Sequence, residues 1–173
     1  MLIHWIWFAT RTGMGDRTKC ALLSHFEDPE AIYFAPESEL ERFEDLSAAA
    51  VESMMEKELT DCEQILDRCR QKGIHILTYQ DAAYPARLKN IPDPPMVLYY
   101  KGTLPHFDEL PVIGVVGTRK ASVYGMTSAK RLGYQIAACG GTVVSGMATG
   151  IDAVAMKGAL TAGGTVVGVL ETG

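Results

Sequence analysis

The pattern of hydrophobic and polar positions changes near residue 60. Up to that point apolar residues recur three and four positions apart, which predicts short helices that each bury one face. Beyond it, short apolar runs rich in β-branched residues are followed by glycine and then by a helical pattern, which predicts alternating strands and helices. We therefore expect a small all-α module over residues 1–60 and an α/β domain over residues 61–173.

The first module is predicted to contain short helices separated by Gly, Pro and Asp residues. Its first break, Gly13-Met14-Gly15, is typical of SAM-like and helix–hairpin–helix-like modules, and in the latter the hairpin amides can hold a DNA phosphate. Because the surrounding sequence is acidic, we favour a tight connection without DNA contact. Helices are expected at residues 2–9, 17–26 and 29–35, from a cap at Ser38 to Phe43, and at residues 47–56.

Three tyrosines stand out in the segment that follows, Tyr84, Tyr99 and Tyr100. Their rings could stack on bases. Packing is the expected role for at least two of them, because tyrosine is common where a sheet meets a loop. The segment is predicted to contain a helix at residues 60–72 capped by Thr60, strands at 74–78 and 96–100, and a short helix at 85–88.

The stretch PVIGVVGTRKASVYG, residues 111–125, predicts a strand, a turn and the start of a helix. The apolar run at residues 112–116 is typical of a parallel strand with both faces covered by helices. Gly117 allows a sharp turn, and Ser122 is positioned to cap a helix that continues to Gly140. We expect this strand–turn–helix unit to be the centre of the functional site.

Phosphate binding is the chemistry that this turn suggests. The start of a helix gathers unpaired backbone N–H groups and a partial positive charge, which together favour an anion. Arg119 and Lys120 lie in the same turn. Both backbone and side chains would therefore contribute positive potential.

A second glycine turn repeats this plan. Residues 142–145 predict a strand, and the loop SGMATGID at residues 145–152 leads into a helix over residues 153–160. A third strand is expected at residues 165–170. This alternation predicts a Rossmann-like, doubly wound and mainly parallel sheet with right-handed connections. Ligands of such sheets bind beyond the carboxyl ends of the strands, where both turns emerge.

The uneven distribution of charge keeps nucleic acid among the candidate ligands. The 173-residue chain is 47% hydrophobic, which is typical of a globular protein, and carries a net charge of −5. Residues 1–73 hold eight Lys/Arg against fifteen Asp/Glu, whereas residues 74–173 hold eight against six. A local basic face is possible on residues in or after the glycine turns, namely Arg119, Lys120, Lys130, Arg131 and Lys157.

The cysteine, histidine and hydropathy patterns suggest neither a metal nor a membrane. The four cysteines form no CxxC pair and the four histidines have no ligand spacing, so we expect reduced thiols, no metal and no cofactor. The apolar first residues lack the basic flank and cleavage site of a secretion signal. No apolar run approaches the roughly 20 residues that span a bilayer. We expect a cytoplasmic protein.

Several motifs in order resemble the DNA-processing protein A family (DprA, also called Smf). The resemblance covers nearly all of residues 74–173, and residues 1–60 are similar in size and place to the family's N-terminal domain. It is specific because several motifs share order and spacing, and the sequence lacks the GxGxxG fingerprint of dinucleotide enzymes. The motifs are Asp81-x-x-Tyr84-Pro85, then PDPPMVLYYKG, GVVGTRKASVYG and SGMATGIDAVAMKGAL.

The resemblance implies a protein that binds and protects single-stranded DNA and helps to load the recombinase RecA on it during natural transformation. It also implies a homodimer in the full-length protein and a sheet that continues beyond Gly173, so we expect a truncated chain. No residue is assigned a catalytic role. The family's two loop motifs imply that DNA phosphates contact Gly117, Thr118, Arg119, Lys120, Ser122, Ser145, Gly146, Met147, Ala148 and Gly150.

Alternatives stay open for single residues and for the function. Arg119 is expected to bind a phosphate rather than a surface carboxylate. For Ser145, phosphate binding and a strand-end cap are equally compatible with the sequence, and Asp152 is expected to cap its helix and brace the loop. The alternative function is a nucleotide-processing enzyme of the phosphoribohydrolase type, whose general acid or base would be Asp152 or Glu171.

Overall fold

The computed structural model describes residues 1–170 and divides the chain into two compact units, residues 1–104 and 105–173. This boundary differs from the predicted one at residue 60. The reason is that Cys62, Met96 and Val97 belong to the same buried cluster as the N-terminal helices. No helix within the described part of the chain has the length and hydropathy needed to cross a membrane.

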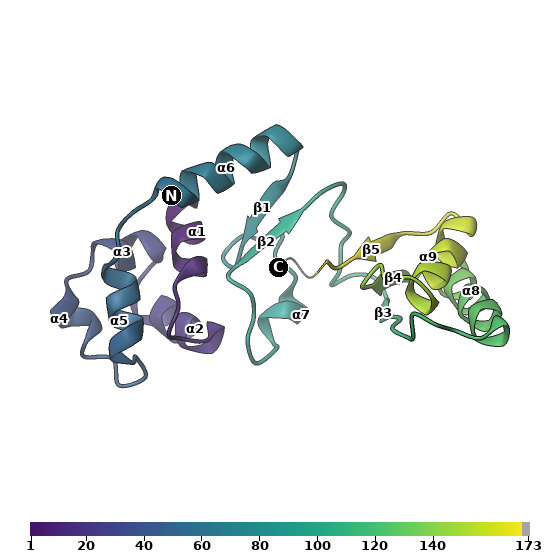
Figure 1. The fold of residues 1–173 in the computed structure, drawn as a ribbon, viewed down its shortest axis with the longest axis horizontal. Helices are drawn as coiled ribbons and strands as arrows, with labels where there is room; N and C mark the ends of the chain where they lie inside the picture. Colours follow the sequence, from purple (N-terminus) through teal and green to yellow (C-terminus); the bar gives the residue numbers. More distant parts are fainter. Residues whose placement is uncertain (171–173) are drawn as a thin grey trace. The chain divides into compact units, whose positions relative to one another are not determined.

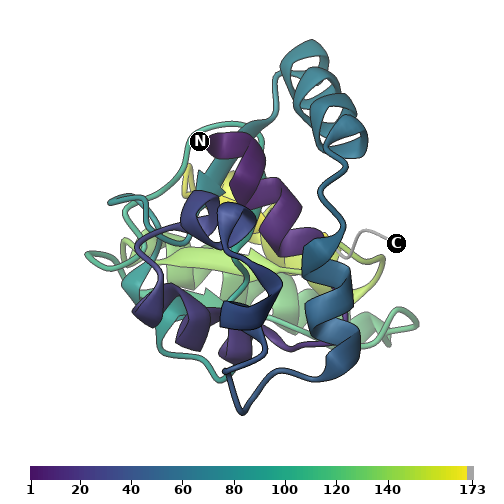
Figure 2. The same ribbon diagram turned by 90° about the vertical axis from the view of Figure 1, so that its left-hand side faces the viewer.

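The first unit starts with the predicted series of helices (Figures 1 and 2). Local capping explains several boundaries: the Asp28 carboxylate accepts from Ala31 N at 2.9 Å, and the Ser47 hydroxyl accepts from Ala50 N at 3.1 Å. Two predicted caps are wrong, because Pro36 and Leu59 occupy the N-cap positions instead of Ser38 and Thr60. The helices are α1 (Leu2–Thr10), α2 (Asp16–His25), α3 (Pro29–Phe34), α4 (Glu37–Leu40), α5 (Ala48–Met55) and α6 (Thr60–Lys72).

The turn between α1 and α2 packs against the start of α5. A Cβ added to Gly13 would lie 2.8 Å from Ala50 N, and the Ser47 hydroxyl donates to the Gly13 carbonyl at 3.1 Å. This is the geometry of a tight structural connection, the interpretation that the acidic sequence favoured.

Large apolar side chains fill the core of the first unit. Ile6, Trp7 and Phe8, three consecutive residues of α1, are each fully buried. The Trp7 indole N–H donates to the Glu56 carbonyl at 2.8 Å, so the one polar atom of this side chain is satisfied. Burial of such side chains is the main source of stability in a small domain.

A two-stranded antiparallel sheet completes the first unit. Strands β1 (His75–Thr78) and β2 (Val97–Tyr100) pair with His75 opposite Tyr100, and the short helix α7 (Ala86–Lys89) lies between them in sequence. Tyr84 is buried and donates its hydroxyl to the Pro95 carbonyl at 2.9 Å, and burial raises its pKa to about 12. Its role is therefore packing.

The second unit contains a three-stranded parallel sheet, which confirms the predicted Rossmann-like fold class (Figure 1). The strands run in the order β3-β4-β5, and helices α8 and α9 connect them. Val112 pairs with Thr142, and Val143 with Val166. The bounds are β3 (Val112–Gly114), α8 (Val123–Ala138), β4 (Thr142–Ser145), α9 (Ile151–Thr161) and β5 (Val166–Gly168).

Both helices of the second unit cover the same face of this sheet. Two successive right-handed connections that step in one direction place their helices on one side, and α8 and α9 both pack against β4. Within residues 105–170, Ile113 of β3 is 42% exposed. Strand β3 ends at Gly114, so Val116, which is 84% exposed, lies in the turn beyond it. The predicted strand at residues 112–116 with both faces covered is therefore wrong, because the strand is shorter and is not covered on both faces.

Helices α8 and α9 approach each other closely through two glycines. A Cβ added to Gly133 would overlap the Ala155 carbonyl oxygen, and one added to Gly158 would overlap the Lys130 carbonyl oxygen. The remaining core is made of small and medium apolar residues, among them Ala129, Ala155 and Ala159. Close backbone approach therefore holds the second unit together.

Candidate nucleic-acid interface

The first glycine turn joins β3 to α8 as predicted. Ser122 is the N-cap of α8, and its hydroxyl accepts from Gly125 N at 3.1 Å. Gly117 permits a close approach to the second loop, because a Cβ here would lie 2.6 Å from the Ile151 Cβ. Arg119 and Lys120 are exposed beyond this point.

The second glycine loop lies directly against the first. Gly150 has a φ of 90°, and a Cβ added there would overlap the Thr118 carbonyl oxygen and lie 2.8 Å from the Arg119 Cα. The Thr118 carbonyl also accepts from Ile151 N at 3.2 Å. The backbones of the two loops are therefore neighbours at one edge of the sheet.

The buried side chain of Asp152, at the end of the second loop, contacts the first loop. This side chain is 3% exposed, and Oδ1 accepts from Gly117 N at 3.0 Å. A Cβ on Gly146 would lie 3.3 Å from the other carboxylate oxygen, so this loop passes over the same side chain. The predicted role as loop brace is confirmed, whereas the predicted cap is not, because Gly150 is the N-cap of α9 and no side chain caps it.

Ser145 supports the loops from below. The side chain is buried, and its hydroxyl donates to the Val115 carbonyl at 2.8 Å. Its carbonyl accepts from Val169 N at 2.9 Å. The sequence left open phosphate binding and a strand-end cap for Ser145, and this buried hydrogen bond at the end of β4 matches the strand-end cap.

Met147 holds the second loop in an unusual conformation. Its φ of 57° lies in the left-handed region, which is uncommon for a residue with a side chain. The side chain packs on the Gly168 backbone at the end of β5, where an added Cβ would lie 2.5 Å from Met147 Cγ. Such strain costs on the order of 1–3 kcal/mol and persists where packing fixes it.

Unpaired backbone amides lie where the loops meet, and two exposed cationic residues belong to the first loop. Among residues 1–170, the backbone N–H groups of Thr118, Arg119, Gly146 and Met147 donate to no other residue. Arg119 and Lys120 form no ion pair there either. Exposed donors and free cations in this arrangement suit the oxygen atoms of phosphates.

The structure brings nine of the ten predicted contact residues to this rim, with Ser145 buried beneath them. Sequence reasoning omitted Thr149, which is exposed between Ala148 and Gly150 and has a hydroxyl. Thr149 could have been included from the sequence, because it lies inside the loop motif SGMATGID at residues 145–152. Glu171, the second acid–base candidate, lies outside the described residues.

Comparison of the sequence with known proteins finds relatives that carry the names DprA and Smf. A family model described as DNA recombination-mediator protein A matches residues 75–173. Protein Smf of Synechocystis sp. is 33% identical over 98% of this chain and 44% of its own length, and DNA processing protein DprA of Bacillus subtilis is 32% identical over 84% and 49%.

The fold has a counterpart among solved structures. The X-ray structure of DNA processing protein A (DprA) from Streptococcus pneumoniae matches with a TM-score of 0.75 and 26% identity, over all of this chain and 59% of that chain. The present chain thus spans about half the length of the relatives that it matches.

Proposed function

The chain belongs to the DNA recombination-mediator protein A family, and from this premise we propose that its two glycine loops bind the backbone of single-stranded DNA. The observation that carries the proposal is the contact between the loops, in which Gly150 abuts Arg119 and Asp152 joins Gly117 to the second loop. Neighbouring sets of unpaired amides match the successive phosphates of a polynucleotide.

An open rim suits a polymer better than a small metabolite. Arg119, Gly146 and Met147 are exposed, and small-molecule sites usually enclose most of their ligand. Single strands are held by positive surface along the backbone, with little demand for sequence-specific pockets. We propose binding without turnover as the corresponding activity, and in support Asp152, one of the two acid–base candidates, is buried and already accepts from Gly117 N.

The wider role is proposed from the family. The protein would protect incoming single-stranded DNA and load RecA on it during natural transformation, within the cytoplasm and as a homodimer of a longer chain. The relatives are about twice as long as the segment matched here, and we propose that the surfaces for RecA and for the dimer lie in their remaining length. The loops would supply the DNA contact in that assembly.

Removal of Arg119 tests the DNA contact. We expect Arg119→Ala to lower the affinity for a labelled oligonucleotide about tenfold at low salt, and to reduce the slope of log K against log salt by about 0.7 for each lost phosphate contact. Arg68→Ala is the matched control, because Arg68 is an exposed arginine of α6 in the other unit. Equal titrations for the wild-type chain and Arg119→Ala would count against the proposal.

A turnover assay separates binding from the enzymatic alternative. Incubation of the chain with nucleoside monophosphates should release neither base nor phosphate, and these mononucleotides should compete poorly with the oligonucleotide. Release of a free base that disappears in Asp152→Asn would instead favour a phosphoribohydrolase.

A further inference from the structure

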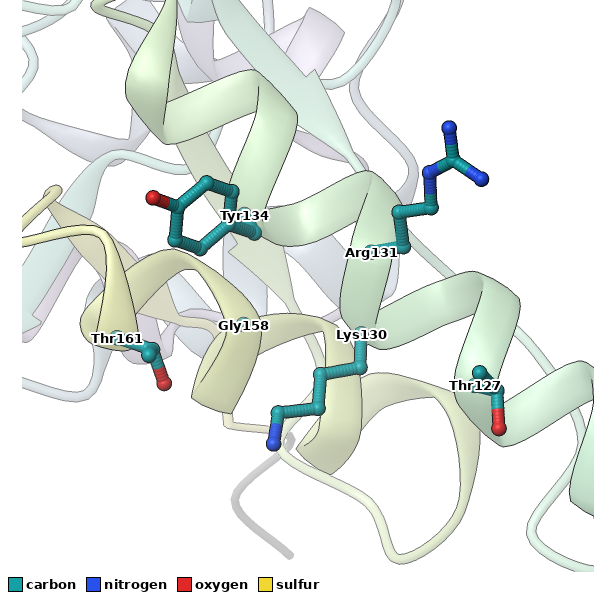
Figure 3. Close-up of a pocket in the computed structure, with 6 residues that line it drawn as sticks. All are labelled: Thr127, Lys130, Arg131, Tyr134, Gly158 and Thr161. Carbon is teal, nitrogen blue, oxygen red and sulfur yellow. The ribbon is translucent and has the colours of Figure 1, made fainter.

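A groove lies between α8 and α9, away from the glycine loops (Figure 3). It has a volume of about 280 Å³. Thr127, Lys130, Arg131 and Tyr134 line it from α8, at the spacing of three and four that places side chains on one face of a helix. Gly158 and Thr161 line it from α9.

The close helix crossing builds this groove. Gly158 has no side chain, and a Cβ there would overlap the Lys130 carbonyl oxygen and lie 3.0 Å from Tyr134 N. The floor is therefore backbone, and Lys130 and Tyr134 project from the point of closest approach. Their positions are set by the helix packing of the unit.

The exposed surface of the groove itself is mostly apolar, and the two cations that border it, Lys130 and Arg131, have no acidic counterpart on α8 or on the facing end of α9. No Asp or Glu occurs in α8, and the single acid of α9, Asp152, is buried at the other end of that helix. Lys130 and Arg131 form no ion pair within residues 1–170. Figure 3 shows Lys130 beside α9 and Arg131 extending away from it, so cations lie in the groove and on its margin.

The aromatic ring adds a second kind of contact. Tyr134 lies in the C-terminal half of α8 and is 48% exposed. A tyrosine ring next to cations provides a stacking surface for a base while the cations hold its phosphates.

We propose that the α8–α9 groove is a second contact for single-stranded DNA, in which Lys130 and Arg131 bind phosphates and Tyr134 stacks on a base. The inference rests on the proposed function of the glycine loops. Helix α8 starts at the first loop, and at about 1.5 Å per residue Thr127 lies roughly one turn and Tyr134 roughly three turns along it. A strand that leaves the loops could follow this helix into the groove.

Charge-matched double variants test the phosphate contacts. Lys130→Ala/Arg131→Ala should bind a labelled oligo-dT of about 20 nucleotides roughly tenfold more weakly than the wild-type chain at low salt, with a salt slope reduced by up to about 1.4. Arg68→Ala/Lys101→Ala removes the same charge, one arginine and one lysine, from exposed positions of the other unit, and should bind nearly as the wild type does.

Variants of Tyr134 test the stacking contact. Tyr134→Leu should lose at least about fivefold in affinity, whereas Tyr134→Phe keeps the ring and should retain it. If Tyr134→Leu and Tyr134→Phe lose the same affinity for the oligonucleotide, or if the two double variants do, the groove is not a DNA contact.

Comparison with Arg119→Ala separates the two hypotheses. If Arg119→Ala weakens binding and the groove variants do not, the loops bind DNA and the groove inference is wrong. If only the groove variants weaken binding, the assignment of the loops is wrong. A wild-type chain that fails to bind the oligonucleotide would overturn both.

Discussion

The two units of this chain are stabilised by opposite means. The first encloses whole aromatic side chains, with Trp7 and Phe8 fully buried, and its core extends from α1 to β2. The second contains no buried aromatic residue within 105–170 and depends on glycine and alanine where α8 crosses α9. We therefore expect the first unit to be sensitive to loss of volume and the second to gain of volume.

Loss of volume in the first unit gives the largest expected effect. Trp7→Ala removes a fully buried indole and its hydrogen bond to the Glu56 carbonyl, and should destabilise the unit by about 3–5 kcal/mol. Phe34→Ala is the control, because this ring is 71% exposed, and should cost less than about 1 kcal/mol. Both tryptophans lie in α1, so fluorescence of the remaining Trp5 during urea unfolding reports this unit. Similar midpoints for the two variants would contradict the comparison.

Gain of a single methyl group tests the second unit. Gly158→Ala places a Cβ against the Lys130 carbonyl and should destabilise the helix pair by about 1–3 kcal/mol. Gly125→Ala adds the same methyl group to α8 at a site where the nearest atom is 3.4 Å away. It should be neutral or slightly stabilising, because alanine favours a helix.

Hydrogen exchange of the α8 and α9 amides measures this pair of variants within their own unit. Faster exchange in Gly158→Ala, with unchanged exchange in α1, is the expected outcome. If Gly158→Ala exchanges as slowly as Gly125→Ala, close backbone approach is not what holds the helices.

The sequence predicted the features that follow from a local pattern or from the alternation of strands and helices. Ser122 follows a strand and precedes an apolar helical pattern, and it caps α8 as expected. The two glycine turns were predicted at one rim because parallel strands end on the same side, and Gly150 does lie against Arg119. The cap depends on neighbouring residues alone, and the shared rim follows from the parallel order of the strands.

Features that depend on distant packing were missed. The boundary between units lies beyond β2 because Met96 and Val97 complete the core of the N-terminal helices, which no local pattern reveals. The close crossing of α8 and α9 could have been predicted, because a glycine inside a helix often allows another backbone to pack closely against it. Gly133 and Gly158 are both glycines of this kind. Val116 was expected inside a covered strand, but β3 ends at Gly114 and Val116 lies exposed in the turn beyond it.

The smallest expected effect concerns a cation inside the aromatic core of the first unit. Lys57 Nζ lies 5.0 Å from the centre of the Trp7 ring and 5.1 Å from that of Tyr33, and among the described residues it has no hydrogen-bond partner. Burial, with a smaller contribution from Arg11, lowers the pKa of Lys57. The rings offset only part of the lost hydration.

Lys57→Met should therefore stabilise the first unit by up to about 1 kcal/mol at neutral pH, because the thioether fills the same space without a charge. Between the lowered pKa of folded Lys57 and its ordinary value of 10.5, the unfolded chain binds more protons at this residue than the folded chain does. The free energy of unfolding of the wild-type chain therefore rises with pH in that interval, because the cost of burying the charge disappears. The advantage of the variant should be largest at neutral pH and shrink toward pH 10.5 in urea titrations followed by tryptophan fluorescence. A variant less stable than the wild type at neutral pH would mean that the cation–aromatic contacts outweigh the cost of burial, and that a charge stabilises this core.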